Sequence, residues 1–158
     1  MNKYFSLHIL SDTCASLLVL LWSYSLGKKL MAFAEFRMQM TDQVFPASMV
    51  PFLVYGLLLA QLLCAALLLF PKYRLLGFWS SLLLMSLFTG YIGLVLLKAF
   101  TQVPCHCISI LAGMDFKQHF FFNLFFTAVA GLGLIFTLKK ERRDKGMDTI
   151  VSHAPLPA

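Results

Sequence analysis

The sequence predicts an all-α integral membrane protein, a bundle of four transmembrane helices with a short interfacial helix after the first span. Three observations predict this class. Of the 158 residues, 59% are hydrophobic and only 13% are charged, whereas an ordinary soluble domain is about 25% charged. The apolar residues gather in four runs, each near the roughly 20 residues that a helix needs to cross a bilayer. These runs fill most of residues 1–138, so the sequence predicts one membrane domain there and no second domain.

The four predicted spans cover residues 7–27, 49–70, 75–97 and 119–138. A cleaved signal peptide is the alternative interpretation of the first run. It is disfavoured because Cys14 precedes the most apolar stretch, Leu17–Leu21, whereas the cysteine of a lipoprotein signal follows that stretch. No A-x-A-like cleavage site follows it either. The first run is therefore predicted to be a retained span.

Four residues of the first two spans, namely Asp12, Cys14, Gln61 and Cys64, are candidates for a functional role. Asp12 lies close to the predicted membrane surface, so contact with headgroup water is favoured over a function inside the membrane. Gln61 lies near the middle of the second span and needs a hydrogen-bonding partner on another helix. Cys14 and Cys64 are interpreted as small apolar packing residues. The alternative is an inner pair that relays electrons to cysteines outside the membrane.

The segment between the first two spans, residues 28–46, predicts the short interfacial helix. Phe33, Phe36 and Met40 recur at helical spacing, with charged residues between and around them. Anchoring at the bilayer surface is the favoured role, and docking of a partner protein is the alternative.

The third span is rich in small and hydroxyl-bearing residues, namely Ser80, Ser81, Ser86, Thr89, Gly90, Tyr91 and Gly93. Small side chains allow a neighbouring helix to approach closely. Tyr91 is interpreted as a tyrosine of the interfacial aromatic belt. The alternative is that its hydroxyl bonds the loop that follows.

The net charge of +6 reflects membrane topology and does not indicate nucleic-acid binding. Eight of the 13 Lys and Arg residues fall at the N-terminus, between spans two and three, or after span four, and five fall in the other two loops. The positive-inside rule therefore predicts that both termini are cytoplasmic. Residues 139–158 are basic and polar, and they are predicted to form a disordered cytoplasmic tail.

The outward-facing loop before span four carries a C-x-C motif, formed by Cys105 and Cys107 after Pro104. Two thiols one residue apart form a disulfide only if the backbone bends, because a disulfide needs Cα atoms roughly 4.4–6.8 Å apart. Such a bond is strained and labile, which is typical of catalytic or regulatory disulfides. The predicted outward face is also the compartment in which disulfides persist.

The start of span four places His119 on the side of the membrane that displays the C-x-C motif. Asp115 and Gln118 have the spacing of a capping box at a helix N-terminus. His119 and Asn123 lie one turn apart, and Thr127 continues the same face. A nearby histidine can favour the thiolate or carry its proton. The alternative is that His119 and Asn123 only bond neighbouring helices.

Over residues 29–136 the sequence resembles the MauE/DoxX family of redox-associated membrane proteins. The resemblance rests on Lys29-Leu30, Phe36–Met40, Leu84–Ile92, Pro104–Cys107 and His119 with Asn123. It implies a four-helix protein of the bacterial cytoplasmic membrane with a C-x-C before its last helix. The branch that gives the family its name is implicated in maturation of a disulfide-rich extracytoplasmic enzyme of methylamine metabolism, beside a thioredoxin-like partner. For this chain the resemblance implies the redox association and not that pathway. The chain departs from the family pattern at Ile108-Ser109, where glycines are usual, and at Gln61, where glutamate is common.

Together these features predict a membrane thiol-disulfide protein whose catalytic residues are Cys105, Cys107 and His119. Its expected partners are the lipid bilayer and an extracytoplasmic thioredoxin-like or cysteine-containing protein. No cofactor and no resident metal are predicted. Two alternatives remain, a structural partner subunit and a soft-metal module in which Cys105, His106, Cys107 and His119 bind Cu(I).

Overall fold

The computed structural model describes residues 2–41, 46–97 and 116–152, which form five α-helices and one short 3₁₀ helix. These are α1 (Asn2–Met31), α2 (Phe33–Thr41), α3 (Val50–Leu69), η1 (Pro71–Tyr73), α4 (Arg74–Leu96) and α5 (Phe116–Ser152). No strand occurs in this part of the chain. The predicted all-α class is confirmed.

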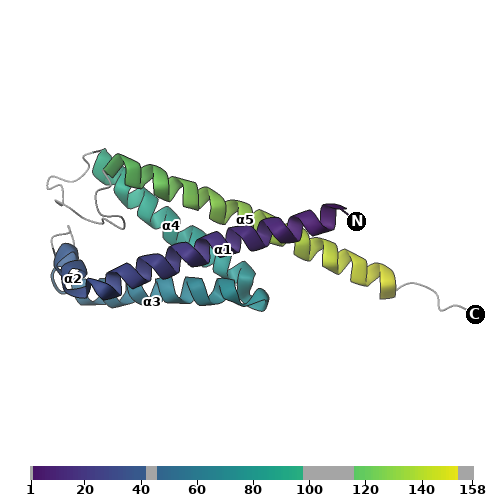
Figure 1. Cartoon of the computed structure of the whole chain (residues 1–158), viewed down its shortest axis with the longest axis horizontal. Helices are drawn as coiled ribbons and strands as arrows, with labels where there is room; N and C mark the ends of the chain where they lie inside the picture. The colour runs from purple at the N-terminus through teal and green to yellow at the C-terminus, as the bar shows by residue number, and fades with distance from the viewer. Residues whose placement is uncertain (1, 42–45, 98–115, 153–158) are drawn as a thin grey trace, which may run out of the picture.

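The four long helices form a bundle in which α1 packs against α3 and α5, and α4 packs against the same two helices. Figure 1 shows the start of α1, the η1 turn and the end of α5 toward one end of the bundle. The short helix α2, the end of α4 and the start of α5 lie at the opposite end, which we call the α2 end. An even number of crossings brings both termini to the same end.

Four helices are long and apolar enough to cross a membrane, over Leu7–Met31, Val50–Leu69, Pro71–Leu96 and Lys117–Arg143. They coincide with the four predicted spans to within a few residues at each end. Helices are the form expected for such segments, because in lipid every backbone N–H and C=O must be paired within the protein. The chain is therefore a multi-pass membrane protein.

A tight turn joins α3 to α4. Phe70 ends α3 in an extended conformation (φ −91°, ψ 116°), because the following Pro71 disfavours helical geometry in the residue before it. Pro71 then starts η1, where its missing N–H costs no hydrogen bond. The two helices consequently pack side by side in antiparallel orientation.

The short helix predicted between the first two spans is confirmed as α2. It follows α1 after the single turn residue Ala32, whose N–H still donates to the carbonyl of Lys28 at 3.1 Å. On its inner side the buried Phe36 packs with Val50 and Val54 of α3. This apolar contact fixes α2 against the start of α3.

The disordered tail predicted from residue 139 is wrong for residues 139–152, because α5 continues as a helix through Ser152. Helix elongation costs little once a long helix exists. The first residues beyond the predicted span, Lys139 to Arg143, are also strong helix formers. Residues 153–158 lie outside the described residues.

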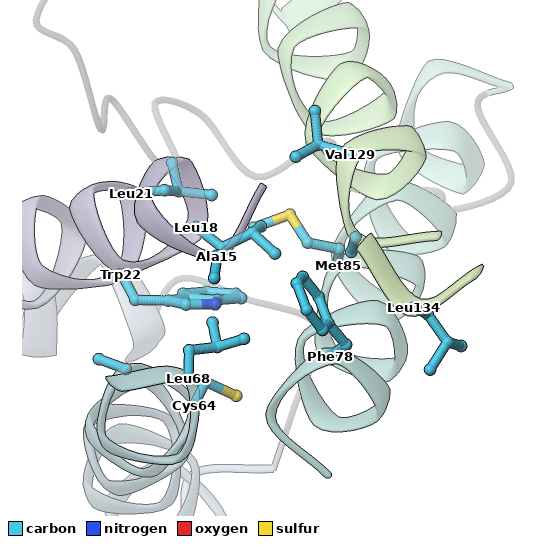
Figure 2. Close-up of a cluster of buried hydrophobic side chains, with 12 residues drawn as sticks. Ala15, Leu18, Leu21, Trp22, Cys64, Leu68, Phe78, Met85, Val129 and Leu134 are labelled. Atoms are coloured by element: carbon cyan, nitrogen blue, oxygen red, sulfur yellow. The ribbon is translucent and has the colours of Figure 1, made fainter. Parts of the chain in front are cut away.

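The core of the bundle is centred on Trp22, which is 1% exposed. Figure 2 shows it between Leu18 and Leu21 of α1, Leu68 of α3, and Phe78 and Met85 of α4. Its indole Nε1 donates a hydrogen bond to the Oγ of Ser81 on α4 at 3.0 Å. A large aromatic residue is thus held in one orientation by a polar contact, because its N–H would otherwise be unpaired in an apolar interior.

Close approach between helices occurs at Gly77 and Gly133. A Cβ added at Gly133 would meet the ring of Phe78 at 2.1 Å, and one at Gly77 would meet the backbone N of Leu68 at 2.9 Å. The small residues noted in the third span include Gly90 and Gly93 but not Gly77. Among the described residues, a Cβ at Gly90 would have no neighbour within 4 Å, and one at Gly93 would meet Phe120 at 3.4 Å.

Candidate functional site

The C-x-C motif lies outside the described residues, as do His106 and the predicted helix cap Asp115. The catalytic role of Cys105 and Cys107 therefore stays a prediction. The segment that carries them joins the end of α4 to the start of α5, and both of these helix ends lie at the α2 end of the bundle.

His119 lies in the first turn of α5 and is buried, with 5% of its surface exposed. Its ring stacks on Phe122, with 6.4 Å between centroids and 22° between planes. The Nδ1 atom has no hydrogen-bond partner among the residues that the structure describes. A buried ring nitrogen without a partner is costly, and water or a ligand that bonds Nδ1 would recover this free energy.

Asn123 lies one turn deeper on the same buried face of α5 and is 1% exposed. Its Nδ2 also lacks a partner in the described part of the chain, so it does not bond Nδ1 of His119. The predicted polar stripe continues to Thr127, whose hydroxyl donates to the carbonyl of Asn123 at 2.8 Å. Thr127 Oγ1 and Thr89 Oγ1 of α4 lie 3.1 Å apart, which links the stripe to a second helix.

A second group of polar side chains lies on α1 and α3. The Oγ of Ser25 accepts one hydrogen bond from Lys29 Nζ at 2.7 Å and another from Gln61 Nε2 at 3.0 Å. The predicted interhelical partner of Gln61 is therefore Ser25. Gln61 is fully buried, and its Oε1 has no partner within residues 2–41, 46–97 and 116–152.

Lys29 is the residue that the sequence interpretation missed. The sequence interpretation used it as a loop charge and as part of the family resemblance and gave it no place in the site. Its ammonium bonds Ser25, one turn further from the α2 end, and lies 5.7 Å from the centroid of the Phe36 ring. Lysines near the end of a span usually extend toward water, whereas this one turns into the bundle. We call Ser25, Lys29 and Gln61 the polar cluster.

Lys29 forms no ion pair within the described residues, where the recorded pair is Arg74 with Asp12. That pair joins the start of α4 to α1 at the end of the bundle remote from α2. Asp12 was expected to contact headgroup water, and its side chain is indeed 56% exposed, but Arg74 was not foreseen as its partner. The polar cluster therefore carries a positive charge without a neighbouring carboxylate in the described chain.

The inner cysteines are free and occupy packing positions. Cys64 is buried in the core cluster, and its Sγ lies 3.5 Å from the hydroxyl oxygen of Ser80. Cys14 packs against the same cluster. Their surroundings agree with small apolar packing residues.

Metal binding finds no support within the described residues, where no group of three His, Cys, Asp or Glu side chains could hold an ion. Three of the four candidate Cu(I) ligands, Cys105, His106 and Cys107, lie outside them. The soft-metal alternative therefore stays a prediction.

Comparison with known proteins agrees with the resemblance seen in the sequence. The family model described as "Methylamine utilisation protein MauE" matches residues 7–136. No curated protein and no solved structure matches the chain. The family match includes Ser25 and Gln61, the C-x-C motif, and both His119 and Asn123. Since it extends over well more than half of the 158 residues, from the first span to near the end of the fourth, the chain belongs to the MauE family.

Proposed function

We propose that this protein is a membrane thiol-disulfide component that oxidises cysteine pairs of an extracytoplasmic partner through Cys105 and Cys107. The observation that carries the proposal is His119, which is buried at the α2 end with an unpaired Nδ1. The segment with the two cysteines leads directly into the helix that carries this histidine. Membership of the MauE family supports a redox association, whereas nothing in the chain points to methylamine itself.

The exchange proceeds in two steps. A thiolate of the partner attacks the Cys105 sulfur, the Cys105–Cys107 bond breaks, and Cys107 leaves as a thiolate that takes up a proton. A second thiolate of the partner then attacks the partner sulfur of the mixed disulfide and releases Cys105. Two electrons and two protons have now passed to the C-x-C pair, and the partner holds a new disulfide.

The assignment of Cys107 as leaving group follows from its place in the chain. Cys107 is closer than Cys105 to the start of α5, and the N-terminal end of a helix stabilises a nearby negative charge. The better-stabilised thiolate leaves, so Cys105 carries the mixed disulfide.

This function places the protein in the bacterial cytoplasmic membrane with both termini in the cytoplasm. Residues 1–138 form the membrane domain, and the α2 end faces outward. The expected partner is an extracytoplasmic protein of thioredoxin type or a substrate with paired cysteines. To react with this partner, the protein needs an accessible C-x-C motif. The partner does not need to contact the interior of the bundle.

Trapping of the mixed disulfide tests the proposal. In Cys107→Ser, the Cys105 thiolate can attack the disulfide of the oxidised partner, and the thiol that would displace the partner from Cys105 is missing. We therefore expect this variant to accumulate a covalent adduct that reductant releases. Cys105→Ser removes the attacked sulfur and should form none. Non-reducing electrophoresis of intact cells, followed by identification of the attached protein, measures both variants in a background of Cys14→Ala and Cys64→Ala.

If Cys105→Ser formed the adduct and Cys107→Ser did not, the roles of the two cysteines would be exchanged and the mechanism would stand. Absence of an adduct in both variants, with full biological activity, would leave a structural subunit as the function.

His119 gives a second, independent prediction. An imidazole that favours the thiolate lowers the pH at which a thiol reacts. In His119→Ala, the midpoint of the pH profile for alkylation of Cys105 and Cys107 should therefore move to higher pH. His8→Ala, a change near the start of α1 at the other end of the bundle, is the control and should leave the midpoint in place. Equal midpoints in the two variants would assign His119 to packing.

A further inference from the structure

We propose that the η1 turn and the start of α4 bind an anionic phospholipid in the leaflet that this end of the bundle faces. Lys72 and Arg74 hold the headgroup phosphate, and exposed apolar side chains beside them contact the acyl chains. This lipid site goes beyond the proposed thiol-disulfide function and uses no residue of the C-x-C segment.

The η1 turn lies where the surface of the bilayer is expected. It joins two segments that are each long and apolar enough to cross a membrane, Val50–Leu69 and Pro71–Leu96. A connection between two antiparallel spans lies at the level of the lipid headgroups, because the spans fill the apolar layer. Tyr73 in this turn is 48% exposed, and tyrosines are enriched in that interfacial layer.

Positive charge is concentrated at this turn. Lys72 is exposed, and its Nζ lies 5.5 Å from the centroid of the Tyr73 ring. Arg74 follows two residues later, with 18% of its side chain exposed. Residues 69–76 contain no Asp or Glu, and the carboxylate recorded beside the two cations is that of Asp12 on α1. One positive charge therefore lacks a counter-ion within the described chain, and a phosphate group supplies it.

Arg74 keeps hydrogen-bond donors that Asp12 does not use. A guanidinium group has five N–H donors, and the recorded contact joins Nη1 to one carboxylate oxygen. The Nε atom is buried and has no partner among the described residues. An unpaired buried donor costs free energy that an oxygen acceptor recovers. Arginine often binds phosphate through two parallel N–H···O bonds, so a phosphate suits the remaining donors.

Exposed apolar side chains adjoin the two cations. Leu69 and Phe70 at the end of α3 are 62% and 61% exposed, and Leu76 in the first turn of α4 is 57% exposed. A phospholipid joins a phosphate to apolar chains, so it meets the cations and these side chains together. Inorganic phosphate has no apolar part to place against them. The combination therefore favours a phospholipid over a soluble oxyanion.

Trp79 reports which lipid lies beside this site. It follows Leu76 by three residues on α4 and is 53% exposed, whereas the other tryptophan of the chain, Trp22, is buried in the core. Bromine atoms on lipid chains should therefore quench mainly Trp79.

The experiment uses the full chain in phosphatidylcholine vesicles that contain a small fraction of phosphatidylglycerol with brominated chains. Brominated phosphatidylcholine at the same fraction gives the reference quenching. We expect phosphatidylglycerol beside Trp79 to be enriched about fivefold or more over its fraction in the bilayer, from the attraction of an interfacial Lys or Arg for anionic lipid.

Two variants test the two cations. Lys72→Gln should lower the enrichment by about fivefold, because one interfacial charge is lost. The double variant Asp12→Asn/Arg74→Gln should also lower it, although the net charge is unchanged, because the guanidinium that binds the phosphate is gone. Circular dichroism checks that both variants fold. Lys72 is exposed, so Lys72→Gln keeps the test valid if the double variant does not fold.

The matched control is Lys139→Gln, which removes an equal charge from an exposed position on α5. In the described chain η1 contacts α3 and α4 but not α5, so this variant should keep the enrichment of the parent. Inorganic phosphate, compared with chloride at equal ionic strength, should not displace the brominated lipid.

Three results would overturn the site: equal quenching by the two brominated lipids, equal enrichment in Lys72→Gln and Lys139→Gln, or loss of the enrichment in inorganic phosphate. The second result would assign the preference to the overall charge of this end of the bundle. The third would assign the cations to a soluble oxyanion.

Discussion

Gly133 is the residue at which α4 and α5 come closest to a steric limit. The ring of Phe78 occupies the position that a side chain at Gly133 would need. Phe78 is fully buried, so it has no free space into which to move, and cores are packed to near crystal density. Because Gly133 has no side chain, the ring of Phe78 can reach the centre of the bundle.

Gly133→Ala should therefore destabilise the protein by about 1–3 kcal/mol, the usual cost of overpacking a filled core. Gly131→Ala is the control on the same helix, since a Cβ there meets no atom within 4 Å. Thermal unfolding in one detergent, followed by circular dichroism, measures both. Equal melting temperatures for the two variants would contradict the packing of Phe78 on Gly133.

At the scale of the helices, polar contacts link α1 to each of its neighbours. Ser25 bonds Gln61 of α3 and Trp22 bonds Ser81 of α4. At the other end, the Ser11 hydroxyl lies 2.9 Å from that of Thr137 on α5. Lipid chains are as apolar as the helices, so burial contributes little to helix association in a membrane, and such contacts help to select the packing partners.

The contact between Ser25 and Gln61 should be measurable as a coupling between α1 and α3. In a cycle of Ser25→Ala, Gln61→Leu and the double variant, we expect a coupling free energy of about 0.6–2 kcal/mol, the range for interhelical hydrogen bonds in membranes. Unfolding by denaturing detergent measures each variant. The control pair is Ser25→Ala with Gln39→Leu, a change in α2. The effects of these two substitutions on the free energy of unfolding should be additive. If the effects of Ser25→Ala and Gln61→Leu on the free energy of unfolding were additive, the contact between the two side chains would add no stability.

At the scale of the whole molecule, most Lys and Arg residues lie at one end of the bundle, the end that also holds both termini. The end with the η1 turn and the start of α1 carries Lys72, Arg74 and the basic residues that follow the fourth span. The α2 end carries fewer Lys and Arg, and one of them, Lys29, is turned into the bundle. The positive-inside rule predicts that the more basic end is cytoplasmic.

This orientation predicts which cysteines an impermeant reagent reaches. After reduction of intact cells, a charged maleimide should label Cys105 or Cys107 and leave Cys14 and Cys64 unlabelled, because the latter pack in the core. The variant with both Cys105→Ser and Cys107→Ser controls for background. Labelling that needs permeabilised cells would invert the topology and refute the proposed function with it.

The fold was largely predictable, and the site only in part. The spans and α2 follow from local patterns, and so does the helical spacing of His119 and Asn123. Three features could not be foreseen. Phe78 packs on Gly133, Arg74 pairs with Asp12 and Lys29 turns inward, and each depends on residues that are distant in sequence. The helical extension of α5 to Ser152 was missed because polar composition was given more weight than helix propagation.

The sequence by itself determined that this chain crosses a membrane four times, because a run of about 20 apolar residues in lipid must pair its backbone groups within a helix. It also predicted Cys105, Cys107 and His119 as the catalytic residues. Only the tertiary structure decided which polar side chains meet inside the bundle. Ser25 and Lys29 of α1 join Gln61 of α3, because side-chain contacts between helices depend on how each helix is rotated in the bundle, and that rotation is set by packing over the whole length of the neighbouring helices.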